Sequence, residues 1–277
     1  MLILGNNLWI SLYLAEFSHR QYLVNSIFLT LQLNLPTPQS NKMADNKPTL
    51  HHMDNSQSQR ILWLLEELGV EYNVVHHFRK SADDPVAPFR SPESIKTLGP
   101  YGKAPILTTG AADGNRYIPE SDAICTYLLR KFDTEDKFGL HSGDWIRDEI
   151  LNSFNLTTFV RSVYFILFID FDLIRNGVMD YFDGPEMREI LTILDGELKN
   201  APEGGYFMGK NPGRADIMME FPMSFVKHRN WIDLEKEFPK LDEWLKRVYD
   251  RPAWKRGLEK GNGSYDLNVF PKRAVVS

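Results

Sequence analysis

The stretch from residue 49 to residue 78 restricts the fold of this chain more than any other feature. Residues 49–53 (TLHHM) predict a short strand, and residues 71–78 (EYNVVHHF) predict a second one. Between them, Gly69 stands where a helix C-terminus favours glycine. Aliphatic side chains recur before it at helical spacing, namely Ile61, Leu62, Leu64, Leu65 and Leu68. A helix between two strands indicates a βαβ unit.

The later elements divide the chain into two parts. A long polar connection, with at most one short helix around 92–98, leads to two runs, APILTTG and NRYIPE, that predict a hairpin around AADG. A helix begins immediately after Glu120, and from about Asp144 onward the pattern is purely helical. We therefore expect an α/β domain over 48–133, a linker over 134–143 and an all-helical domain over 144–277.

Composition excludes several classes of site. Lys and Arg number 32 against 37 Asp and Glu and form no stripe, so nucleic acid is not an expected partner. Cys125 is the one cysteine, which excludes an intramolecular disulfide, a CxxC redox pair and a thiolate zinc site, and it favours the cytoplasm. His51 and His52, like His76 and His77, are strand neighbours that point to opposite faces, so we expect no metal site.

Residues 1–47 differ from the rest of the chain. Two apolar runs, LILGNNLWISLYLAEF and YLVNSIFLTLQLNL, are interrupted by polar residues before reaching the roughly 18–20 residues that span a bilayer. Neither the basic segment nor the cleavage site of a signal peptide is clear, and scarce acids are a weak sign of a mitochondrial presequence. We expect a disordered or dispensable extension, with Met43 as the alternative start and no membrane as partner.

A cluster of six polar residues, 54–59, precedes the first helix. Capping a helix needs one such side chain, and Ser56 and Ser58 are both ordinary cap residues. The surplus of polar groups therefore suggests that a ligand binds at the entrance to this helix.

Four motifs stand at successive junctions of the predicted elements. They are Ser56 with Arg60 four residues on, Pro105 in KAPIL, Glu120 and Ser121 in ESDAI, and Gly213 and Asp216 in GRADIM. In this order they resemble the glutathione transferase superfamily, and its fungal and bacterial serine-type members look closest. The resemblance covers about 49 to 261 and implies a thioredoxin-like, glutathione-binding domain followed by an all-helical domain.

The resemblance implies that Ser56 activates the thiol of glutathione. A free thiol has a pKa near 8.5, so little thiolate exists at neutral pH. A hydroxyl that donates to sulfur at a helix N-terminus stabilises the thiolate through the hydrogen bond and the helix dipole, without a base or a metal. Ser58 and Asn55 are the alternative donors.

The other motifs imply contacts along glutathione. Pro105 matches the family's cis-proline, and Ala104 before it would pair through its backbone with the cysteinyl part. Lys103 would meet the glycine carboxylate. Glu120 would take the ammonium of the γ-glutamyl end, and the Ser121 hydroxyl with the free N–H groups of its helix would take the carboxylate.

Three further features are given structural roles. Gly213 replaces the hydroxyl residue of the family's capping box, so only Asp216 can reach back to the Gly213 N–H. Cys125 lies in mid-helix, where we expect it to pack as a small apolar residue. A run of aromatic residues is expected to be mainly core, with some members able to line a pocket facing Ser56: Phe154, Phe159, Tyr164, Phe165 and Phe168.

The implied function is conjugation of the glutathione thiolate to an electrophilic small molecule, with proximity and thiolate stabilisation supplying the rate. Glutathione is then a co-substrate, and a hydrophobic electrophile is the second substrate. The resemblance also implies a homodimer, which is typical of the family. Detoxification or a step of fungal secondary metabolism would be the setting. Two alternatives remain, a glutathione-dependent peroxidase and a non-catalytic binding or regulatory module.

Overall fold

The computed structural model describes residues 46–141, 143–171, 185–202 and 205–272. The first part of the chain carries all the strands and helices expected there. They are β1 (Thr49–Met53), α2 (Ser58–Leu68), β2 (Asn73–His77), α3 (Glu93–Lys96), β3 (Ile106–Thr108), β4 (Tyr117–Pro119) and α4 (Ser121–Phe132). The predicted order of elements is therefore confirmed.

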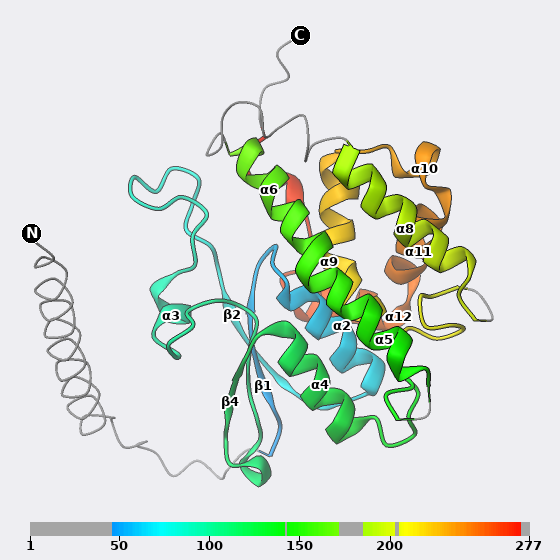
Figure 1. The fold of residues 1–277 in the computed structure, drawn as a ribbon. Helices are drawn as coiled ribbons and strands as arrows, with labels where there is room; N and C mark the ends of the chain where they lie inside the picture. The colour runs from blue at the N-terminus through cyan, green and yellow to red at the C-terminus, as the bar shows by residue number, and fades with distance from the viewer. Residues whose placement is uncertain (1–45, 142, 172–184, 203–204, 273–277) are drawn as a thin grey trace, which may run out of the picture. The chain divides into compact units, whose positions relative to one another are not determined.

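The strands form one mixed sheet in the order β2-β1-β3-β4. β1 and β2 are parallel, as a βαβ unit requires, whereas β3 is antiparallel to both β1 and β4. Helices α2 and α4 cover one side of the sheet and α3 lies on the other (Figure 1). This arrangement is the thioredoxin-like domain that the resemblance implies.

The second part of the chain is helical. It contains α5 (Trp145–Phe154), α6 (Val160–Asp170), α8 (Met187–Lys199), α9 (Arg214–Arg229), α10 (Leu234–Glu237), α11 (Pro239–Asp250) and α12 (Pro252–Lys260). A π-helical turn, Asn155–Phe159, joins α5 to α6, and the two helices run nearly end to end in Figure 1. The predicted continuation of this helix beyond residue 171 lies outside the described residues. Among the described helices, none is both long enough and apolar enough to cross a membrane.

The two parts pack through α2 and α12. Gly257 permits the close approach, because a Cβ there would lie 3.1 Å from the Leu62 carbonyl carbon. At the same contact the buried Glu66 carboxylate pairs with Arg256 at 2.8 Å and with Lys260. One hydrophobic core extends through both parts. The connection between α4 and α5 contains the predicted linker, but the division into separate domains stays a prediction, and residues 1–45 of the predicted extension are not described.

Asp216 anchors the start of α9. It is fully buried, and its Oδ2 accepts the Gly213 N–H at 2.9 Å, as GRADIM predicts for the cap. The same carboxylate also accepts the Phe207 N–H (2.9 Å), the Met208 N–H (3.3 Å) and the Trp244 Nε1–H (2.8 Å). Asp216 therefore joins the loop before α9 to α11 as well as capping the helix.

Candidate functional site

Strand register brings three junctions of the chain to one edge of the sheet. His51 of β1 pairs with Ile106 of β3, and Ile106 pairs with Pro119 of β4. Beyond this row, β1 leads into the polar loop before α2, β3 is entered through the cis Ala104–Pro105 bond, and β4 leaves through Glu120 into α4. The structure thus brings together the motifs around Ser56, Pro105 and Glu120 that the sequence separates by up to 64 residues.

Hydroxyl groups connect the end of β1 to the start of α2. Ser56 Oγ donates to the Met53 carbonyl at 2.7 Å and accepts the Ser58 N–H at 3.2 Å. Ser58 Oγ accepts the Met53 N–H at 3.1 Å and lies 2.7 Å from Ser56 Oγ. The interpretation of Ser58 as a helix cap is therefore wrong. Ser58 is the first residue of α2, and its hydroxyl holds the strand instead of a free helix amide.

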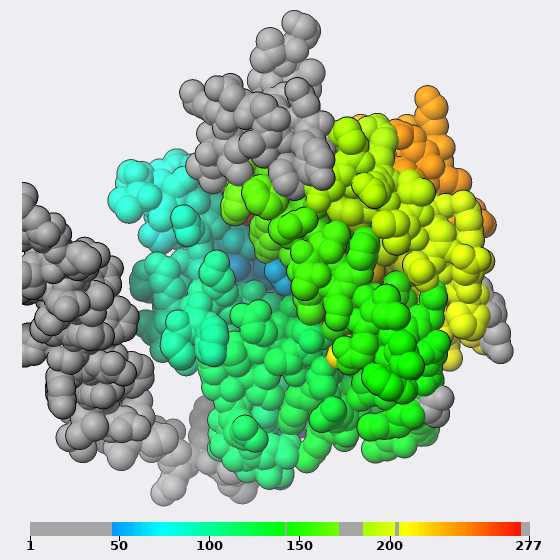
Figure 2. Space-filling model, in the orientation of Figure 1, coloured from blue at the N-terminus to red at the C-terminus, as the bar shows by residue number. Residues whose placement is uncertain are grey.

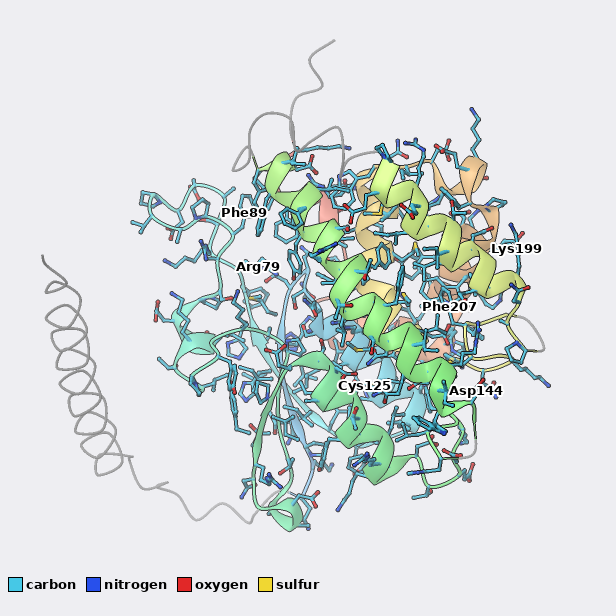
Figure 3. The ribbon with its side chains drawn as sticks, in the orientation of Figure 1. Arg79, Phe89, Cys125, Asp144, Lys199 and Phe207 are labelled. Carbon is cyan, nitrogen blue, oxygen red and sulfur yellow. The ribbon has the colours of Figure 1, made fainter. Side chains whose placement is uncertain are left out.

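Two segments fix the loop that carries Asn55. The Asn55 backbone has φ 45°, and its side-chain oxygen accepts the Asp266 N–H at 2.9 Å. Arg79, just after β2, donates to the Asn55 carbonyl at 3.2 Å and to the Phe89 carbonyl at 3.0 Å (Figure 3). Asn55, the alternative thiol donor, therefore has its oxygen already used and only its N–H₂ available.

Gln57 and Arg60 join the β1–α2 loop to α4, a connection that the sequence does not reveal. The Arg60 guanidinium is buried and donates through Nη2 to both Ser121 Oγ and Gln57 Oε1. Ser121 Oγ in turn donates to Gln57 Oε1 at 3.1 Å, and Gln57 Nε2 donates to the Tyr164 hydroxyl of α6 at 2.9 Å. The first helical turn of α4 is thus positioned by α2 and α6 together.

A proline in α9 explains why Arg60 is buried. Pro222 has no N–H, so the Met218 carbonyl four residues earlier has no partner within the helix. Arg60 Nη1 donates to that carbonyl at 2.7 Å and Asn155 Nδ2 donates to it at 3.0 Å. A proline inside an expected helix was the signal for such an acceptor, but the sequence does not show which donors reach it.

The remaining predicted residues differ in exposure. Pro105 is buried, Ala104 is half-buried, and Lys103 and Glu120 are exposed. Figure 2 shows blue atoms of the β1–α2 region at the bottom of a hollow between cyan segments on one side and green segments on the other. No group of three His, Cys, Asp or Glu side chains in the described part of the chain is arranged to hold a metal ion.

The aromatic run divides between core and surface, so the expectation that it is mainly core holds only in part. Phe159 is fully buried, whereas Phe168 of α6 is 40% exposed. The rings of Tyr164 and Phe168 lie 6.3 Å apart, one helical turn from each other. Because Tyr164 accepts from Gln57, this pair is the part of the run that approaches the polar loop.

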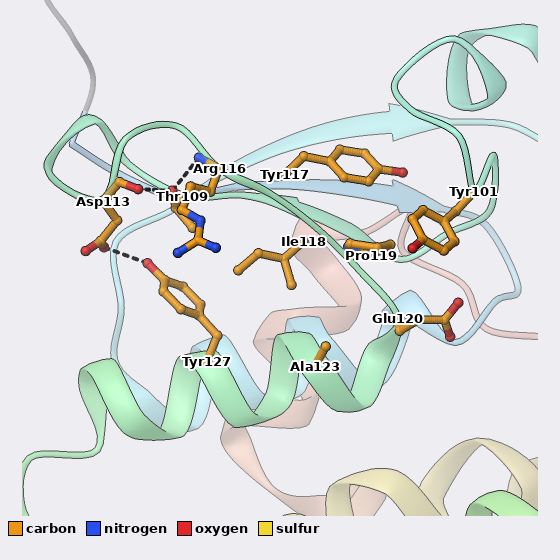
Figure 4. Close-up of a pocket in the computed structure, with 10 residues that line it drawn as sticks. All are labelled: Tyr101, Thr109, Asp113, Arg116, Tyr117, Ile118, Pro119, Glu120, Ala123 and Tyr127. Atoms are coloured by element: carbon orange, nitrogen blue, oxygen red, sulfur yellow. Dashed lines mark hydrogen bonds between the residues drawn. The ribbon is translucent and has the colours of Figure 1, made fainter. Parts of the chain in front are cut away.

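A groove of about 560 Å³ runs between β4 and α4 (Figure 4). Glu120 closes one end of it, and its carboxylate points away from the groove's other acid, Asp113. Asp113 is already paired, since it accepts from the Tyr127 hydroxyl at 2.7 Å and from Lys131 at 2.8 Å. Of the predicted site residues only Glu120 lines this groove, so the groove does not contain Ser56.

Two family models match the chain. Residues 50–136 match the N-terminal domain of glutathione S-transferases, and residues 184–252 match the C-terminal domain. Together the matches cover more than half of the 277 residues. The chain belongs to the glutathione S-transferase superfamily.

Relatives and solved structures agree with this membership. Glutathione S-transferase 3 of Schizosaccharomyces pombe is 29% identical over 76% of this chain and 86% of its own length. Glutathione S-transferase 1 of Saccharomyces cerevisiae is 25% identical over 76% of this chain and 94% of its own. A glutathione S-transferase from Actinobacillus pleuropneumoniae has the same fold, with a TM-score of 0.66 at 23% identity over 80% of this chain and 99% of that one. URE2P8 from Phanerochaete chrysosporium, solved with oxidized glutathione, has a TM-score of 0.61 at 24% identity over 79% and 96%.

In this member of the glutathione S-transferase superfamily Cys125 is inert. It is fully buried in α4 (Figure 3), and burial raises the pKa of its thiol well above the ordinary value. The prediction that it packs as a small apolar residue is confirmed. The protein therefore offers no thiolate of its own, because Cys125 is its one cysteine.

Proposed function

We propose that this chain is a glutathione transferase in which Ser56 activates the glutathione thiol for attack on an electrophilic small molecule. The observation that supports this most is the meeting of the Ser56 loop, the cis Ala104–Pro105 bond and the start of α4 at one sheet edge. Superfamily membership supports it as well. Solved neighbours carry glutathione or 1-(S-glutathionyl)-2,4-dinitrobenzene.

In the proposed complex each end of glutathione meets a complementary group. The exposed Glu120 carboxylate binds the ammonium, and the free N–H groups of the first turn of α4 bind the γ-glutamyl carboxylate, together with the Ser121 hydroxyl once it turns away from Gln57 Oε1. The Ala104 backbone pairs with the cysteinyl part, Lys103 meets the glycine carboxylate, and the sulfur lies at Ser56. The thiolate then attacks the electrophile, held against the exposed aromatic face of α6.

The electrophile is proposed as a hydrophobic small molecule, with an intermediate of fungal secondary metabolism as one source. Turnover of halide, epoxide, enone and peroxide substrates with glutathione distinguishes a transferase from a glutathione-dependent peroxidase. Binding of glutathione without turnover of any of them would favour the non-catalytic alternative.

Changing Glu120 to Gln is expected to weaken glutathione binding. The variant keeps the size of the side chain but loses the charge that meets the ammonium, and a charge-assisted hydrogen bond is worth about 1.5–3 kcal/mol. Calorimetric titration measures the change in Kd. Glu135→Gln, an exposed carboxylate in the connection to α5, serves as the control and should bind as the wild type does. Equal affinities for wild type and Glu120→Gln would refute the assignment.

We further propose that the protein is a homodimer that buries the outer face of α5. Trp145, Ile146 and Ile150 lie on this helix with 63%, 54% and 63% of their surfaces exposed. Ile146 and Ile150 are four residues apart and so share one face of the helix. Clustered exposed apolar side chains on a soluble protein mark an interaction surface.

Ile150→Lys is expected to convert the dimer into a monomer, because a lysine ammonium would have to be buried in the interface. Light scattering after size exclusion gives the mass. Ile193→Lys, which changes an isoleucine of α8 that is 45% exposed, is the matched control and should remain dimeric. A monomeric wild type, or a dimeric Ile150→Lys variant, would refute this interface.

A further inference from the structure

A continuous chain of hydrogen bonds leads from Ser56 into the interior. Ser56 Oγ lies 2.7 Å from Ser58 Oγ, and Ser58 Oγ lies 2.8 Å from His52 Nδ1. His52 Nε2 lies 3.0 Å from the side-chain oxygen of Asn262, just after α12. His52 is 1% exposed, so this series of hydrogen bonds leads from Ser56 away from solvent. If the Ser56 hydroxyl alone activated the glutathione thiol, the hydrogen bonds of Ser58, His52 and Asn262 would have no part in the activation.

The partners fix the direction of the protons when the imidazole is neutral. The Asn262 oxygen accepts, so Nε2 carries the hydrogen and Nδ1 is left as an acceptor. Ser58 therefore donates to Nδ1, and its oxygen still accepts the Met53 N–H. The Ser56 hydroxyl donates to the Met53 carbonyl at 2.7 Å, and a rotation about its C–O bond turns it to Ser58 Oγ, which lies at the same distance. Ser56 Oγ, at the outer end of these hydrogen bonds, also accepts the Ser58 N–H and has one lone pair left that can accept a proton.

We propose that His52 is a positioning residue that receives the proton of the glutathione thiol through Ser58 and Ser56. The inference rests on the proposed function. The S–H bond breaks and its proton passes to Ser56 Oγ, while the Ser56 hydroxyl proton passes to Ser58 Oγ and the Ser58 hydroxyl proton to His52 Nδ1. No proton leaves the site. The products are a thiolate, two intact hydroxyls and an imidazolium.

The product state is fully hydrogen-bonded. The imidazolium donates through Nδ1 to Ser58 and through Nε2 to Asn262, Ser58 donates to Ser56, and Ser56 donates to the sulfur. The hydroxyl of Ser56 thus points at the thiolate because the proton has moved to His52. This connection explains why Ser58 contacts strand and imidazole instead of capping α2.

The surroundings of His52 keep it neutral until the thiolate forms. The ring of His76 lies 5.9 Å away, edge-on, and His77, whose ring lies against His51, acts on His52 only through its charge, as does Asp54 of the loop after β1. Burial, opposed by the Asn262 hydrogen bond, lowers the pKa of His52 below its ordinary value. A Cβ on Gly261 would lie 3.2 Å from Nε2, so the C-terminal segment closes over the ring. The imidazolium is therefore favoured only as the partner of a nearby anion.

Counting protons tests this relay. Glutathione is titrated into the full chain near pH 7 in buffers of different ionisation enthalpy, which gives the protons released per ligand bound. Ultraviolet absorbance gives the thiolate formed, and S-methylglutathione, which has no thiol proton, gives the baseline. We expect the wild type to form thiolate while releasing far less than one proton per thiolate above that baseline.

Variants separate the relay from a structural role. His52→Gln and Ser58→Ala should each lower the thiolate fraction by about tenfold, equivalent to one unit in the pKa of the bound thiol. Any thiolate they form should release one proton to the buffer. His141→Gln, a change at an exposed histidine in the connection between α4 and α5, should keep the wild-type proton count.

The outcomes are distinguishable. Release of one proton per thiolate by the wild type would overturn the relay and leave the transferase proposal standing. Failure of glutathione to bind, or to form thiolate, would overturn both. If His52→Gln does not fold, the protons released per thiolate by the wild type and by Ser58→Ala still test the relay, because both proteins keep the His52 imidazole.

Discussion

Ser56→Ala is expected to raise the pKa of bound glutathione by roughly 1–2 units, because a hydrogen bond to a charged group is worth about 1.5–3 kcal/mol and each unit corresponds to 1.36 kcal/mol. Activity near neutral pH should then fall about 10–100-fold. Since the thiolate fraction rises with pH until the pKa is passed, activity should partly recover at alkaline pH. The measurements are turnover of an activated aryl halide against pH and ultraviolet titration of the bound thiol.

Control variants identify the donor. Ser153→Ala, which changes an exposed serine of α5, should leave both profiles unchanged. Ser58→Ala should also raise the pKa if the relay operates, but by less than Ser56→Ala. A larger shift in Ser58→Ala would identify Ser58 as the donor. No shift in either would assign activation to Asn55 or to a backbone N–H.

Asp216→Ala is expected to give the largest loss of stability. The carboxylate is fully buried and accepts four N–H groups, three from the backbone and one from Trp244. Leaving buried donors without a partner costs about 1–3 kcal/mol for each group, so the free energy of unfolding should fall by at least about 4 kcal/mol. Urea unfolding of both proteins measures the difference.

Two further variants set limits on this loss of stability. Asp250→Ala, which removes an exposed carboxylate at the end of α11, should change the free energy of unfolding by no more than about 0.5 kcal/mol. Asp216→Asn keeps one acceptor oxygen and should lose less than Asp216→Ala. An Asp216→Ala variant as stable as the wild type would show that the loop before α9 satisfies its amides in another way.

The sequence by itself determined the elements and their order. The strand at Thr49–Met53, the end of α2 at Gly69 and the start of α4 after Glu120 all appear where the pattern predicts them. Each depends on local chemistry: an apolar run, a glycine in the left-handed region with φ 64°, and a helix start directly after a strand. The glutathione transferase motifs could be found for the same reason, because each lies at a junction between elements.

The tertiary structure decided which polar groups meet. Ser58 looks like a cap in the sequence, yet it bonds the start of α2 to Met53 and His52 of β1, because the strand end and the helix start lie within hydrogen-bond distance. Arg60 bonds to Met218, 158 residues away, because Pro222 leaves that carbonyl free. Such contacts depend on how α2, α9 and the chain after α12 pack together. No local pattern encodes that packing, so the sequence located the candidate residues of the site while only the fold determined their partners.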